Sequence, residues 1–146
     1  MQEVKRYLAL DVGDKTIGLA LSDLLCLTAQ GLETIRRKSI KDDLKSLGEF
    51  IKTYEVNTLI IGLPKNMDGS EGDRCTIVKN FAEKIAESYP EIEIKFWDER
   101  LSTVAATKAL IAADVSRQKR KKVIDKMAAV QILQGFLDGL KFRGDY

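Results

Sequence analysis

The stretch YLALDVGDKTIGLALSD, Tyr7 to Asp23, constrains the fold more than any other part of this 146-residue chain. Two short apolar runs flank a turn-forming Gly-Asp-Lys-Thr group in which Gly13 can adopt positive φ values, so the pattern predicts a β-hairpin. The first run delivers a carboxylate, Asp11, among apolar neighbours. Burying an ionised carboxylate is costly unless a cation, a metal or hydrogen-bond donors compensate. Asp11 is therefore either a functional acid or a turn cap, and the hairpin alone favours neither.

After the hairpin, predicted helices and strands alternate. The expected elements are a weak third strand at Gly31–Arg36, a helix capped by Ser39, a buried strand at Asn57–Leu63, a helix ended by Pro90, a strand at Ile92–Trp97, a helix capped by Ser102 or Thr103 through about Ala113, and a helix from Val123 to about Leu140. This order predicts one α/β domain spanning residues 1–146. Its expected core is a mixed five-stranded sheet, with antiparallel hairpin strands and two parallel strands, flanked by helices.

The chain contains no histidine, which excludes Ser-His and Cys-His nucleophilic catalysis and zinc sites that need histidine. If the protein activates water near neutral pH, a metal bound by carboxylates is the strongest remaining route. Cys26 and Cys75 have no metal-binding spacing and suggest no disulfide framework. The apolar run before Asp11 is too short for a signal peptide, and no segment has the length of a membrane span, so we expect a cytoplasmic protein with no membrane partner.

Five cations lie within six residues near the C-terminus: Arg117, Lys119, Arg120, Lys121 and Lys122. Removing these five from the 24 Lys and Arg leaves 19 against 22 acidic residues, a net charge of −3, so the basic excess is local. We expect this segment to be a connector. A local basic run is typical of contacts with the phosphate backbone of a nucleic acid, although a solvated loop is the usual alternative.

Three acidic positions accompany this run. Asp11 ends the first strand, Asp98 and Glu99 end the last strand, and Asp125 lies early in the final helix. Each acid alone is readily explained as structural, since an acid in a first helical turn suits the helix dipole. Together they can converge at one edge of the sheet, where strand ends usually hold ligands, and form an oxygen cluster suited to hard divalent cations.

Four segments in series, ALDVGDKTIGLALSD, GLPKNMDGSEGDR, WDERLST and KKVIDKMAAVQIL, resemble the YqgF family, also called RuvX. The resemblance covers nearly the whole chain. It implies a small RNase H-like fold related to the RuvC resolvase. It further implies a nuclease proposed to process the 5′ end of the 16S ribosomal RNA precursor, with cleavage of branched DNA, the Holliday junction, as an alternative.

Carried over by motif, the resemblance implies that Asp11, Glu99 and Asp125 are catalytic and bind Mg²⁺ or Mn²⁺. Asp98 is a further candidate ligand. In an alternating strand, Asp98 points to the same side as Phe96, while Glu99 points to the opposite side, provided that the strand reaches Asp98.

Further residues are candidates for substrate contacts. We expect phosphate contacts from Lys15, Thr16 and Arg100, although a salt bridge to a neighbouring acid is almost as good an explanation for Arg100. The loop around Lys65, Asn66 and Asp68 is either a substrate gate or an ordinary exposed loop.

Two other classes of protein fit parts of the pattern. The Asp-x-Gly turn also resembles the phosphate hairpin of the actin, hexokinase and Hsp70 superfamily, but 146 residues cannot supply the two lobes that grip ATP there. A noncatalytic RNA-binding module of ribosome assembly is the third interpretation. The sequence leaves RNA and DNA substrates, and a monomer or a homodimer, open.

Overall fold

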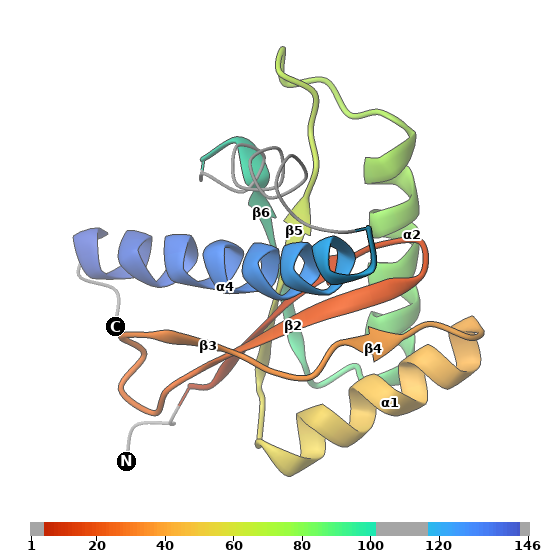
Figure 1. The fold of residues 1–146 in the computed structure, drawn as a ribbon. Coiled ribbons are helices and arrows are strands. Elements are labelled where there is room, and N and C mark those ends of the chain that lie inside the picture. Colours follow the sequence, from red (N-terminus) through yellow and green to blue (C-terminus); the bar gives the residue numbers. More distant parts are fainter. Residues whose placement is uncertain (1–4, 102–116, 144–146) are drawn as a thin grey trace.

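Strand β1, the first half of the predicted hairpin, lies in the middle of a mixed sheet (Figure 1). The computed structural model describes residues 5–101 and 117–143, and in the second range it describes side chains from 127 to 140. In chain order, the elements are β1 (Tyr7–Val12), β2 (Thr16–Ser22), β3 (Ala29–Gly31), β4 (Ile35–Arg36), α1 (Ile40–Thr53), β5 (Thr58–Leu63), α2 (Asp73–Ser88), β6 (Glu93–Asp98), the 3-10 turn η1 (Glu99–Leu101) and α4 (Arg117–Arg143).

The sheet has the order β3-β2-β1-β5-β6. β1 is antiparallel to β2 and parallel to β5, and β5 is parallel to β6. In the register of the sheet, Leu10 lies opposite Leu19 on β2 and opposite Ile61 on β5. The mixed sheet predicted from the sequence is confirmed. Because β1, β5 and β6 run in one direction, their carboxyl ends lie at the same edge, which we call the carboxyl edge.

The predicted third strand is wrong in detail. The sequence predicts one strand at Gly31–Arg36, whereas the structure has two short strands, β3 and β4, that both pair antiparallel with β2. Ala20 pairs with Gly31 and Ile17 with Ile35, so four residue steps on one side match three on the other. One extra residue in an antiparallel pair is a β-bulge, which interrupts the ladder. The sheet therefore has six strands in the described part of the chain rather than five.

Helices cover both faces of the sheet, with α1 and α2 against one face and α4 across the other (Figure 1). Alternate residues of β1 divide between the two cores. Leu8 and Leu10 pack with α1 and α2, while Tyr7 and Ala9 pack with α4. This period of two follows from the pleat of a strand, and it decides which face each polar side chain joins.

The first helix begins where the sequence predicts, because the Ser39 hydroxyl accepts a hydrogen bond from the Asp42 amide at 3.1 Å and caps α1. The basic run is different. The sequence predicts a connector before a helix from Val123, but α4 already begins at Arg117. Arg, Lys and Gln are good helix formers, and the run contains no Gly or Pro to stop a helix. The connector prediction is wrong because charge alone does not indicate a break.

The helix expected from Ser102 or Thr103 to about Ala113 lies outside the described residues. Within the two described ranges, no helix is both long and apolar enough to span a membrane.

Candidate active site

Asp11 lies on the α4 face of the sheet, near the end of β1. It alternates with Tyr7 and Ala9, which pack against α4, and only 7% of its surface is exposed. Its partner on β2 is Gly18. Continuing the β1–β5 register one step beyond the pair Leu10–Ile61 brings Gly62 to its other side. Both lateral neighbours of this buried acid therefore lack side chains.

Glu99 is the first residue after β6 and is also only 7% exposed. A methyl group placed on Gly62 would lie 3.4 Å from Glu99 Cδ and 2.4 Å from Cδ1 of Ile132 on α4. Gly62 therefore lets the Glu99 carboxyl and helix α4 lie directly against the β5 backbone. Two buried acids, Asp11 and Glu99, flank the same glycine on the same face. The sequence carried a signal for this, since a Gly inside a continuous apolar strand often marks a close approach.

Asp125 is a residue of α4, three and four positions before Ala128 and Ala129, which are buried in the core under this helix. Residues three and four apart share a helix face. The Asp125 side chain is outside the described part, so its role as a third ligand stays a prediction. Among the described side chains, no three Cys, Asp or Glu residues form a group that could hold a metal ion.

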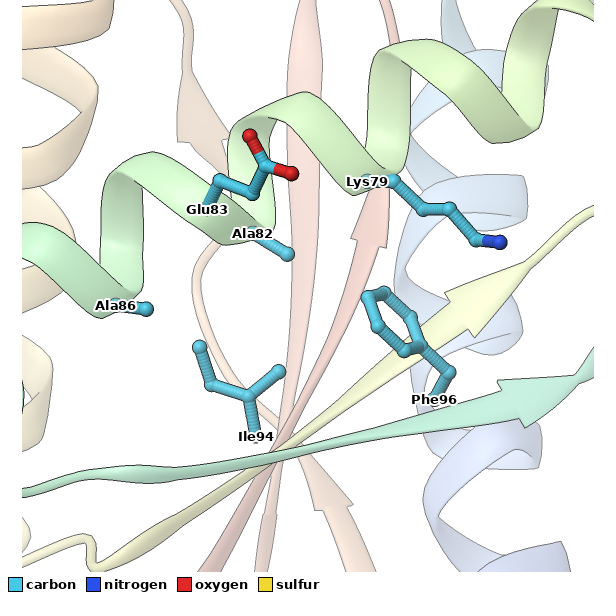
Figure 2. Close-up of a pocket in the computed structure, with 6 residues that line it drawn as sticks. All are labelled: Lys79, Ala82, Glu83, Ala86, Ile94 and Phe96. Carbon is cyan, nitrogen blue, oxygen red and sulfur yellow. The ribbon is translucent and has the colours of Figure 1, made fainter.

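Asp98 lies on the opposite face from Glu99. β6 reaches Asp98, and Asp98 pairs with Leu63, a member of the core under α1 and α2. Figure 2 shows Ile94 and Phe96, which share this parity, pointing toward α2; they line a shallow pocket with Lys79, Ala82, Glu83 and Ala86. Strand parity therefore puts Glu99, and not Asp98, on the face that carries Asp11.

Arg100 is bound to Asp98. Its Nη2 lies 2.8 Å from Asp98 Oδ2, and its Nε donates to the same carboxylate at 3.1 Å. These hydrogen bonds hold the pKa of Asp98 below its usual value. Arg100 Nη1 also donates to the Met67 carbonyl at 3.4 Å, and Gly69, at φ 89°, lies next to the guanidinium. The salt bridge that competed with phosphate binding is therefore present, and it fastens the β5–α2 loop.

The candidate gating residues are engaged inside that loop. Asp68 Oδ1 accepts hydrogen bonds from the Ser70 amide at 2.9 Å and hydroxyl at 2.6 Å, which lower the pKa of Asp68. Asn66 Nδ2 donates to the Ser70 hydroxyl at 3.0 Å, and Lys65 Nζ lies 3.8 Å from Glu71. These contacts describe an ordered turn and provide no sign of a gate.

The hairpin residues lie at the carboxyl edge. Lys15 is exposed in the turn after β1, and Thr16, the first residue of β2, is half-buried; the Gly13 N–H donates to the Thr16 carbonyl at 2.8 Å. The basic run is also directed toward this edge, because α4 passes Gly62 at Ile132 and reaches Tyr7, at the far end of β1, at Phe136. Arg117, Lys119, Arg120, Lys121 and Lys122 precede Ile132 on that helix. Their side chains are outside the described part.

Known proteins match this chain along most of its length. The family model described as "RuvX: Holliday junction resolvase" matches residues 5–139. A protein of Desulforamulus reducens named "Putative pre-16S rRNA nuclease" is 59% identical over 133 residues, 91% of this chain and 96% of that protein. A protein of Staphylococcus epidermidis with the same name is 56% identical over 138 residues, 93% of this chain and 97% of its own.

Solved structures agree on the fold. Thermus thermophilus RuvC in complex with a Holliday junction has a TM-score of 0.58 to this chain, covering 94% of this chain and 96% of RuvC at 9% identity. That likeness establishes an RNase H-like architecture shared with RuvC. The model match over residues 5–139 and the relatives at 56–59% identity show that the chain belongs to the RuvX family of nucleases, which hydrolyse phosphodiester bonds.

Proposed function

We propose that this protein is a metal-dependent nuclease that processes the 5′ end of the 16S ribosomal RNA precursor in the cytoplasm. The observation that carries the proposal is the pair of buried acids, Asp11 and Glu99, that flank Gly62 under α4 at the carboxyl edge. The names of the close relatives support the RNA substrate.

The donor set suits Mg²⁺ or Mn²⁺. Like charges held together in a desolvated site disfavour each other's ionisation, and a bound divalent cation would relieve this repulsion. Carboxylate oxygens are the ligands that Mg²⁺ and Mn²⁺ prefer. Asp11 and Glu99, with Asp125 from α4, are the residues that would hold the cation. A divalent cation bound there supplies Lewis-acid activation of water and neutralises charge at the phosphate.

The chain's own groups provide the rest of the reaction environment. α4 packs on the face of the sheet that carries the acids through Ala128, Ala129 and Ile132, and Asp11 and Glu99 are each only 7% exposed to water. The exposed Lys15 lies in the hairpin turn at the carboxyl edge, and the basic start of α4, Arg117 to Lys122, lies on the end of the helix directed toward this edge. These residues are our candidates for contacts with the phosphates of the RNA. Thr16, the first residue of β2, is a further candidate for a phosphate contact. Arg100 contributes by fastening the neighbouring loop, and we do not assign it a phosphate.

A direct assay compares two substrates under one set of conditions. The purified chain is incubated with Mg²⁺ or Mn²⁺ and with RNA that spans the mature 5′ end of 16S RNA and its leader, and in parallel with a four-way DNA junction. We expect cleavage of the RNA at one position, mapped by primer extension, and loss of cleavage with EDTA.

Each other outcome identifies an alternative. If the DNA junction is cleaved and the RNA stays intact, the protein has the resolvase activity that is named in the description of the family model. RNA binding without cleavage of either substrate would indicate a noncatalytic ribosome-assembly factor. ATP hydrolysis would point to the actin-like class.

A further inference from the structure

Two arginines hold the backbone directly after Asp11. Arg37 Nη1 donates to the Gly13 carbonyl at 2.8 Å, and Arg74 Nη2 donates to the Val12 carbonyl at 3.1 Å. Arg37 lies between β4 and α1, and Arg74 lies in the first turn of α2. Two consecutive carbonyls at the end of β1 are thus held from two separate parts of the chain.

The Arg37 guanidinium is anchored in the protein interior. Its Nε donates to Asp43 Oδ2 at 2.9 Å, and Asp43 is only 2% exposed. The other Asp43 oxygen accepts from the Lys38 amide at 3.1 Å, and the guanidinium lies 4.9 Å from the centre of the Phe81 ring. Arg37 N–H also donates to the Lys15 carbonyl at 2.8 Å, so the hairpin turn is held at both of its ends.

Arg74, at the surface, also combines an ion pair with a hydrogen bond to a backbone carbonyl, as Arg37 does. It is ion-paired with Asp14, a residue of the same turn, while it donates to the Val12 carbonyl. Asp14 therefore orients the guanidinium on the strand end, as Asp43 does for Arg37.

Stability alone does not account for a buried ion pair, because replacing such a pair with apolar side chains is often neutral or stabilising. The location of these contacts is more informative, since groups that orient a metal ligand affect metal affinity without touching the metal. We propose that Arg37 and Arg74 are positioning residues that fix the carboxyl end of β1 and so hold Asp11 in its metal-binding orientation. This inference rests on the proposed function of Asp11 as a metal ligand.

Arg6 offers a matched comparison within the same sheet. Its Nε donates to the Ser22 carbonyl at 3.3 Å, its Nη1 donates to the Tyr54 carbonyl at 3.4 Å, and it lies 5.7 Å from the centre of the Tyr54 ring. Arg6 therefore shares two kinds of contact with Arg37, hydrogen bonds to backbone carbonyls and packing on an aromatic ring, but it lies at the opposite edge of the sheet, beside the start of β1.

The test uses three variants of the full chain: Arg37→Met with Asp43→Leu, Arg74→Gln, and Arg6→Gln as control. Mn²⁺ affinity is measured by calorimetry, amide hydrogen exchange at Gly13 by NMR, and cleavage of the precursor RNA by steady-state kinetics. In the first two variants, we expect Mn²⁺ affinity and kcat each to fall about 10–100-fold, with KM for RNA unchanged. Gly13 exchange should accelerate, because its amide depends on the turn geometry. Arg74→Lys should recover part of the loss.

Arg6→Gln should lower the melting temperature while it leaves Mn²⁺ affinity, kcat and Gly13 exchange unchanged. Folded variants of Arg37 or Arg74 with the Mn²⁺ affinity and Gly13 protection of the wild type would overturn the proposal. If the double variant does not fold, Arg74→Gln decides, because that side chain is partly exposed. A wild type that neither binds Mn²⁺ nor cleaves RNA would refute the proposed function instead. Gly13 exchange in the variants would still show whether Arg37 and Arg74 fix the carboxyl end of β1.

Discussion

The acids on the two faces of the sheet have different neighbours. On the face under α1 and α2, Asp43 is bound by Arg37 at 2.9 Å and Asp98 by Arg100 at 2.8 Å. On the α4 face, Asp11 lies near the end of β1, Glu99 directly follows β6, and both lie beside Gly62.

An arginine that is ion-paired with a carboxylate compensates its charge within the fold, whereas two neighbouring carboxylates favour a bound cation. We therefore propose that the face of the sheet, and not proximity in sequence, separates acids with a structural role from acids of the metal site. Asp98 and Glu99, adjacent in the chain, differ for this reason.

Among the variants that test this comparison, we expect the largest effect on RNA cleavage from Asp11→Asn. We expect it to lower kcat for RNA cleavage by about 10²–10³-fold, the size of loss seen when a group that stabilises developing charge is removed. Without metal, the variant should melt at the same temperature as the wild type or higher, because repulsion within the site is relieved. It should also lose most of the rise in melting temperature that Mn²⁺ gives the wild type. Thermal melts with and without Mn²⁺ check this, and a strongly destabilised variant that still cleaves RNA would show that Asp11 is a structural turn residue.

Gly62→Ala tests the close approach that defines the α4 face. The added methyl would lie 2.4 Å from Ile132 Cδ1, so α4 or the Glu99 carboxyl must move. We expect overpacking to cost about 1–3 kcal/mol in the free energy of unfolding and to reduce cleavage as well. Gly139→Ala on the same helix is the control, because a methyl group added there would have no neighbouring atom within 4 Å. It should stabilise the protein, by up to about 1 kcal/mol. Equal effects of the two substitutions in denaturant titrations would contradict the close packing at Gly62.

The basic start of α4 should affect binding more than chemistry. Replacing Lys119, Arg120 and Lys121 with Gln should weaken RNA binding and reduce the slope of log K against log salt by about 0.7–0.9 for each phosphate that the protein no longer neutralises. Folding should change little, because Gln has a helix propensity close to those of Lys and Arg. An unchanged slope in binding titrations at several salt concentrations would show that the run is only a solvated helical segment.

The smallest effect is expected on the α1–α2 face, from Arg100→Gln. The Arg100 guanidinium holds the pKa of Asp98 below its usual value. A lowered native pKa contributes stability that is complete above the unfolded pKa, about 3.9, and is lost as pH falls through the native pKa. The variant should therefore melt slightly below the wild type at pH 7, and the two should converge in acid. A difference that grows in acid would exclude this pairing as its source.

Local patterns in the sequence predict most of the fold and part of the site. Alternation and turn residues locate the hairpin with Asp11 at its strand end, and Ser39 marks the start of α1. Parity along β6 separates Asp98 from Glu99 before any contact is known. The bulge between β3 and β4 escapes prediction because two short segments separated by three residues resemble one weak strand.

Contacts between distant segments cannot be predicted in this way. Arg37 is 24 residues from Gly13, and Arg74 is 62 residues from Val12, so no local pattern relates them. Arg100 shows the same limit in a milder form. Its partner is only two residues away, but a single sequence cannot decide between a salt bridge and a phosphate contact.

Cleavage of the precursor RNA by Glu99→Gln and Asp98→Asn, measured side by side with Mn²⁺, tests the assignment of the two faces most directly. Both variants replace a carboxylate with an amide of nearly the same shape, so they differ mainly in the face that loses a charge. The account predicts that Glu99→Gln loses at least about 10²-fold in kcat, while Asp98→Asn retains activity. The reverse order would place the metal ligand at Asp98, on the face under α2, and contradict the account.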